Sequence, residues 1–277
     1  MAYIDSSGND TSNSVVIYDA LGLKELRRLT VAHWLTQLAF VPGQTTLLYS
    51  NGGSLIRVPE TGSPTTLSLT DVFWFAISPD GTKLAVLSGA LSSVRIYSYP
   101  GLSLQTTLTV NIAVANGDAD LAFSPDSSQL ALSGGYENPQ VQVFAVSNGV
   151  SHIETATGAS ATYSPAFTAS GTELFVGGGY SDGYVYAFNP ATTGTYLRRL
   201  VGAISYQYSV AIIPGYSKLL AGGYDNVLRI IDSSTGTVNA SYTTSSVINK
   251  ARFSPDGKYV YVGIGAGSSE LVIYRVN

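Results

Sequence analysis

The sequence predicts an all-β protein built from blades of four short antiparallel strands. One observation is the stretch Asp120–Phe144, which contains three strand-sized runs separated by a Pro-Asp-Ser-Ser turn and by Gly134-Gly135. A second observation is that the unit recurs at intervals of 39 to 47 residues. Its third strand starts at Val15, Leu55, Val94, Val141, Val185, Leu228 and Leu271. A repeat of about 40–45 residues made of strands indicates a β-propeller, so we expect a single propeller domain over residues 1–277.

The first strand of the unit recurs six times and carries a small residue near its start. Five of the six strands have an alanine there, and these are Ala39, Ala76, Ala122, Ala166 and Ala211. A small residue lets the inner strands of neighbouring blades pack without voids. The sixth strand has Arg252 instead. We expect the aliphatic stem of Arg252 to fill the gap at the ring closure and its guanidinium to reach the central channel. There the guanidinium has either a purely structural role or binds a ligand.

The two ends of the chain hold incomplete repeats. Residues 1–31 contain matches to a second, third and fourth strand and take part in ring closure, whereas the C-terminus stops at a third strand. Two closures fit this pattern. We favour seven blades, because Asn13–Val31 has the pattern of a hairpin. The alternative is a six-bladed ring that Glu25–Val31 completes, with residues 1–19 as an appendage.

Two sequence motifs resemble the WD-repeat and YVTN-repeat propellers, and the likeness covers essentially the whole chain. They are SPDG after the first strand and KYVYVGIG from Lys258. The chain departs from the WD pattern because no repeat ends in Trp-Asp and no Gly-His pair opens a repeat. The resemblance implies the propeller fold. Similar propellers include lactonases and other hydrolases.

The composition narrows the classes of function. Only 12% of residues are charged, about half the usual share of roughly 25%, which fits either thin strands with few charged positions or a surface that packs in an assembly. The net charge of −4 without a basic run argues against nucleic acid as a partner. There is no cysteine, no signal-peptide pattern at the N-terminus and no apolar run of membrane-spanning length. We expect a protein made without a leader, cytoplasmic or virion-associated.

Aromatic residues gather in the loops expected on one face. Three repeats carry Gly-Gly-Tyr turns after the second strand, and linkers before the first strand carry further aromatics. Tyrosine and tryptophan supply contact area at a small cost in entropy. The candidate binding-surface residues are Trp34, Trp74, Tyr136, Tyr180, Tyr206, Tyr208 and Tyr224. The alternative is a purely structural role, in which the glycines form tight turns with positive φ and the tyrosines cover the ends of the sheets.

Groups for catalysis are scarce. His33 and His152 belong to different repeats, and the carboxylates of Asp118 and Asp120 are too few for a calcium site. We expect no catalytic residues, no metal and no cofactor. The predicted function is a non-catalytic module for protein–protein interaction or structure, for example in a virus or phage particle. The alternatives are a lactonase-like hydrolase and a glycan-binding propeller.

Overall fold

The chain folds into β-strands joined by turns and loops. The computed structural model describes residues 2–5, 13–19, 24–31, 35–114, 119–180, 182–200, 205–213, 217–254, 256–265 and 270–275, and this part of the chain contains no helix. Its strands form seven sheets. Backbone contacts divide the chain into two compact units, residues 1–109 with 266–270 (unit 1) and residues 110–265 with 271–277 (unit 2), and each is described by itself.

Unit 1 contains three sheets. The first consists of β1 (Ala2–Asp5), β2 (Asn13–Asp19) and β3 (Lys24–Val31). The second consists of β4 (Leu35–Phe40), β5 (Leu47–Asn51), β6 (Ser54–Val58) and β7 (Thr65–Thr66). The third consists of β8 (Val72–Ile77), β9 (Lys83–Ser88), β10 (Ser93–Ser98) and β11 (Leu104–Thr109).

Unit 2 contains the other four sheets, although the first residue of the last strand, β27, belongs to unit 1. The first two sheets hold β12 (Leu121–Phe123), β13 (Gln129–Ser133), β14 (Gln140–Ala145) and β15 (Ser151–Thr155), then β16 (Thr162–Phe167), β17 (Leu174–Gly178), β18 (Val185–Phe188) and β20 (Arg198–Leu200). The short β19 (Gly194–Thr195) joins the outer edge of β15 in parallel. The last two sheets hold β21 (Ser209–Ile212), β22 (Lys218–Gly222), β23 (Val227–Asp232) and β24 (Val238–Thr243), then β25 (Ile248–Phe253), β26 (Tyr259–Ile264) and β27 (Glu270–Arg275).

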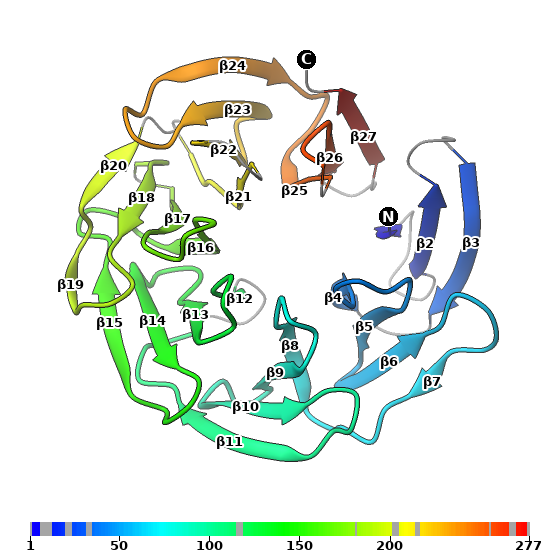
Figure 1. Cartoon of the computed structure of the whole chain (residues 1–277). Helices are drawn as coiled ribbons and strands as arrows, with labels where there is room; N and C mark the ends of the chain where they lie inside the picture. The colour runs from blue at the N-terminus through cyan, green and yellow to red at the C-terminus, as the bar shows by residue number, and fades with distance from the viewer. Residues whose placement is uncertain are drawn as a thin grey trace. The chain divides into compact units, whose positions relative to one another are not determined.

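The predicted repeat is confirmed. Each sheet is an antiparallel meander apart from the added β19, and the predicted first and third strands fall within observed ones. Within unit 2 the first strands β12, β16, β21 and β25 lie side by side in order, and the fourth strands lie at the opposite edge of their sheets (Figure 1). Successive meanders that pack on one another through their faces are the blades of a β-propeller, which is the fold class of this chain.

The predicted four-stranded antiparallel blades are confirmed, but the predicted number of seven is wrong. Six sheets begin with a first strand of the repeat, so the described residues contain six blades, of which the last, β25–β27, has three strands. The sheet β1–β3 lacks a first strand among the described residues and is not a complete blade. The six-blade alternative is also wrong in one detail, because β3 pairs with β2 from Asn13↔Val31 to Asp19↔Lys24. The hairpin stays together because Val15 and Val31 are buried against the sheet β4–β7.

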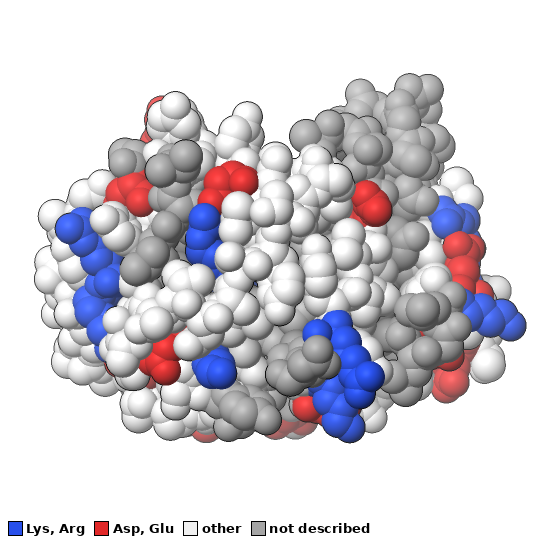
Figure 2. Space-filling model, turned by 90° about the horizontal axis from the view of Figure 1, so that it is seen from above, with Lys and Arg blue, Asp and Glu red and all other residues white. Residues whose placement is uncertain are grey.

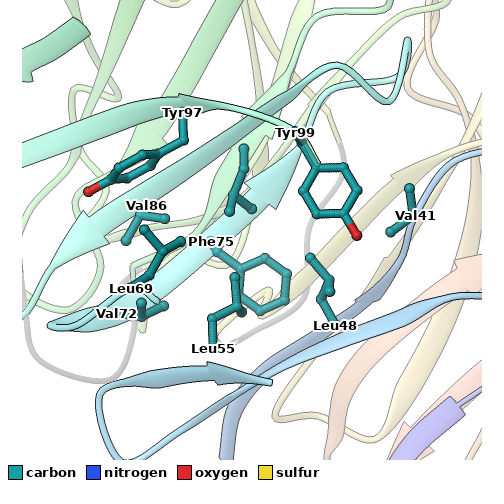
Figure 3. Packing of buried hydrophobic residues seen from close by; sticks show 10 residues of the cluster. Val41, Leu48, Leu55, Leu69, Val72, Phe75, Val86, Tyr97 and Tyr99 are labelled. Carbon is teal, nitrogen blue, oxygen red and sulfur yellow. The ribbon is translucent and has the colours of Figure 1, made fainter. Parts of the chain in front are cut away.

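Within each unit the hydrophobic core lies between successive sheets. In unit 1, Phe75 of β8 is fully buried and its ring points toward Leu48 and Leu55 of the preceding sheet (Figure 3). Removing such a side chain from water is worth about 1.5–3 kcal/mol. Four of the five first-strand alanines belong to such a cluster or pack against one, and these are Ala39, Ala122, Ala166 and Ala211.

Candidate functional site

Six tyrosines of unit 2 form one connected cluster, which we call the tyrosine patch. Its members are Tyr136, Tyr163, Tyr180, Tyr206, Tyr208 and Tyr224. Tyr206 is the centre: its ring stacks on Tyr208 with centroids 5.3 Å apart and planes 7° apart. The centroids of Tyr180, Tyr224 and Tyr136 lie 5.5, 6.3 and 6.5 Å from that of Tyr206. These distances are within the range of favourable aromatic pairs.

The segment that carries Tyr206 is clamped between two glycine turns. Gln207 donates its backbone N–H to the carbonyl of Gly178 at 2.9 Å, and Tyr224 donates its N–H to the carbonyl of Tyr206 at 3.0 Å. A Cβ atom on Gly223 would collide with the Tyr206 carbonyl oxygen. Glycine is therefore required there by close approach of two backbones. The expected positive φ occurs in these three Gly-Gly pairs only at Gly135, where it is 73°.

The outer members of the patch are exposed although their rings touch the centre. Tyr136, Tyr180 and Tyr224 expose 48%, 65% and 56% of their surface. Beneath them Tyr163 is buried and pairs edge-on with both Tyr206 and Tyr208. The patch thus has a rigid base and three accessible rings, each from a different sheet.

A buried amide lies within the clamped segment. Gln207 is fully buried, and neither its Oε1 nor its Nε2 has a hydrogen-bond partner within the described residues. The hydroxyls of Ser160 and Ser205 are in the same condition. Buried polar atoms without partners cost free energy. These three side chains add polar groups to the base of the tyrosine patch, which is otherwise aromatic.

Of the two tryptophans predicted for the binding surface, the structure describes only Trp74. Trp34 lies outside the described residues. Trp74 belongs to unit 1 and lies in strand β8, which corrects its expected place in a linker, because pairing with β9 already begins at Val72. Its indole is half-buried and meets Phe73 edge-on at 6.2 Å. The structure therefore assembles five of the seven predicted surface residues.

A second polar cluster lies on the first strands of unit 2. The Lys250 ammonium on β25 forms an ion pair with the Asp120 carboxylate and donates to Ser164 Oγ at 3.4 Å. Arg252, two residues further on, is exposed and donates from Nη1 to the carbonyls of Ala251 and Val210 at 2.9 and 3.3 Å. Sequence reasoning singled out Arg252 and missed Lys250. The alternation of side chains along a strand was the signal that could have linked them.

The other polar residues that the sequence singled out do not form a further site among the described residues. Asp126 accepts hydrogen bonds from Ser124 Oγ and the Ser128 N–H at 2.6 and 3.1 Å, and these bonds lower its pKa, so turn geometry explains the S-P-D aspartates. Asp118 lies outside the described residues. No group of three metal-ligating side chains occurs in the described ranges. A shallow groove of about 530 Å³ lies near Glu173 and Asn189, at the end of β17 opposite the tyrosine patch.

No protein-family model matches the chain, and no curated protein sequence matches it. None of the described segments is a helix long and apolar enough to cross a membrane. The fold class therefore rests on the sheets themselves.

Proposed function

We propose that this chain is a non-catalytic β-propeller that binds a protein partner through the tyrosine patch, as one component of a larger assembly such as a virus or phage particle. The observation that carries the proposal is the exposure of Tyr136, Tyr180 and Tyr224 around the held ring of Tyr206. Contiguous exposed aromatics on a rigid base are typical of contact sites in which a few residues supply most of the binding energy.

The charge distribution supports a partner that presents apolar and main-chain groups. The patch contains no Asp, Glu, Lys, Arg or His side chain. The face of the molecule drawn in Figure 2 is mostly uncharged, with its lysines, arginines and acids in small groups. Such a surface provides little electrostatic steering, so specificity depends on shape and hydrogen bonds from the tyrosine hydroxyls. The SPDG turns add the proposal that the chain is a relative of the WD-repeat or YVTN-repeat propellers.

The experiment compares Tyr136→Ala, Tyr180→Ala and Tyr224→Ala in the full chain. Each variant is tested for incorporation into the native assembly, isolated from its source and sized by sedimentation, beside its melting curve. Tyr242→Ala is the matched control, because Tyr242 is 40% exposed, lies on β24 and is not part of the patch. We expect all three variants to melt nearly as the parent does. Truncation of the tyrosine that lies most centrally in the interface should lower the binding free energy by about 2 kcal/mol or more, which is roughly thirtyfold in affinity.

Three outcomes would contradict the proposal. Unchanged melting with unchanged incorporation would move the search to the uncharged outer strands β11 and β24. Lower stability with unchanged incorporation would show that the tyrosines only seal the sheet ends. Retention of the parental chain, but not of the variants, on an immobilised glycan would replace the protein partner by a carbohydrate.

A further inference from the structure

The first strands of this protein are free of charge except for one. The strands β4, β8, β12, β16 and β21 contain no Asp, Glu, Lys or Arg, whereas β25 contains both Lys250 and Arg252. Side chains two residues apart on a strand point to the same face, so the two cations share one side of β25. The surrounding protein partly desolvates both groups and lowers their pKa although both side chains reach solvent; the Arg252 charge also lowers the pKa of Lys250, and the Asp120 charge opposes both shifts. Placing two like charges together is unfavourable unless something compensates them.

Asp120 forms an ion pair with only one of the two cations, although its charge also acts on Arg252. Its Oδ1 accepts the N–H of Leu121 at 3.0 Å, which fixes the carboxylate, and its Oδ2 takes the Lys250 ammonium. Arg252 has no ion pair with an acid in the part of the chain that the structure describes. The cluster therefore carries a net charge of one positive unit.

The donors that remain open are held in place. Lys250 uses two of its three N–H groups, on Asp120 and Ser164. Arg252 is anchored through Nη1 to the carbonyls of Val210 and Ala251, while its Nε and Nη2 have no partner among the described residues. Both side chains reach solvent: 42% of the Lys250 side chain is accessible, and Arg252 is exposed. A ligand thus meets a guanidinium edge that is already immobilised.

We propose that Lys250 and Arg252 form a binding site for a small monocarboxylate. The planar guanidinium edge matches the two oxygens of a carboxylate, and the third ammonium proton of Lys250 adds a donor. One negative charge neutralises the cluster, whereas a dianion such as sulfate adds repulsion from Asp120. This site uses none of the residues of the tyrosine patch and does not depend on the proposed function.

The test follows the Arg252 Nε–Hε signal by NMR while the full-length protein is titrated with sodium acetate at constant ionic strength. Parallel titrations use sodium chloride and sodium sulfate. We expect a saturable shift with acetate and an affinity at least tenfold weaker for the other two anions. Chloride and sulfate shifts equal to those with acetate would overturn the proposal, as would the absence of saturation.

Variants followed by acetate-dependent calorimetry complete the test. Arg252→Gln should weaken acetate binding at least tenfold, and Arg252→Lys, which keeps the charge but loses the planar edge, should weaken it less. Lys250→Gln leaves the Asp120 carboxylate unpaired, so its effect is measured in the double variant Lys250→Gln/Asp120→Asn, which should fold and bind acetate weakly. Lys258→Gln is the control, because the side chain of that lysine is 72% exposed in the turn between β25 and β26 and the variant should bind acetate as the parent does. Parental affinity in Arg252→Gln would refute the site.

Discussion

At the scale of single residues, Glu154 is the most unusual ionisable group. It lies in β15 and is 1% exposed, because β19 covers the outer edge of that strand through the pair Glu154↔Gly194. Its Oε1 is 3.8 Å from His152 Nε2, which is beyond hydrogen-bond distance. Burial raises the pKa of Glu154 to about 7 and lowers the pKa of His152. The folded protein thus favours the neutral acid.

The free energy of unfolding should therefore fall as the pH rises from about 4.5 to about 7. In this window the unfolded chain ionises Glu154 while the folded chain keeps it protonated, and above the folded pKa the penalty stays constant. The penalty is on the order of 3 kcal/mol. Denaturant titrations of the parent and Glu154→Gln across this range isolate the effect, since His152 is common to both. The stability difference should grow with pH and level off near pH 7; a difference that does not change with pH would contradict the raised pKa.

Individual residues were predictable where a local pattern marked them. The Gly-Gly-Tyr turns predicted that Tyr136, Tyr180 and Tyr224 lie on one side of the sheets, because strand direction fixes the side on which a loop emerges. Lys250 was missed because its partner Asp120 is 130 residues away and three sheets distant. Gln207 was missed because only the backbone clamp on Gly178 and Gly223 buries it. A single sequence contains no signal for such contacts.

At the scale of elements, the strands of the blades were predictable, whereas the short extra strand β19 was not. Runs of β-branched and aromatic residues located the first and third strands of every blade. β19 has only the residues Gly194 and Thr195, a run too short to predict a strand from sequence, and forms because the connection between β18 and β20 reaches the edge of the preceding sheet. Pairing of this kind depends on the packing of two sheets and is set by tertiary structure.

The packing between elements can be tested with two alanines that face each other across β12 and β13. Ala122 pairs with Ala131, and both belong to the interface with the next sheet, Ala131 fully buried and Ala122 partly so. Replacing Ala131 with leucine should overpack this interface and cost about 1–3 kcal/mol, whereas Ala122→Leu should cost less. Thermal melts measure both. Equal, parental melting temperatures would show that the assignment of these strands to a blade interface is wrong.

At the scale of the whole molecule, the repeat predicted the fold class but not the number of blades. The sequence contains seven third strands and only six first strands, and the prediction of seven blades rests on the hairpin pattern of Asn13–Val31. That hairpin does form from β2 and β3, yet the strand that pairs with the other edge of β2 is β1, which matches a second strand of the repeat. Local pairing is decided by neighbouring residues, whereas ring closure depends on contacts between the two ends of the chain, which no local pattern records.

The inventory of reactive groups across the molecule leads to the last prediction. No group of three metal-ligating side chains occurs within the described residues, His33 lies outside them, and His152 is on β15 beside Glu154. The closest approach to a hydrolytic pair is Lys250 with Ser164. Ser164 is 1% exposed and donates to the carbonyl of Val210 at 3.3 Å, and Lys250 is engaged by Asp120. A nucleophile needs an accessible oxygen and a free base, and this pair has neither.

We therefore expect purified protein to contain no stoichiometric metal and to hydrolyse neither a δ-lactone nor p-nitrophenyl phosphate above the buffer rate. Elemental analysis and initial-rate assays on one preparation measure both quantities, and Ser164→Ala with Lys250→Met serve as controls for activity that arises from the pair. A metal at one equivalent would place a ligand set among residues such as His33 and Asp118. Turnover that disappears in Ser164→Ala would instead make the Lys250 cluster catalytic, because the hydroxyl must then become accessible when substrate binds.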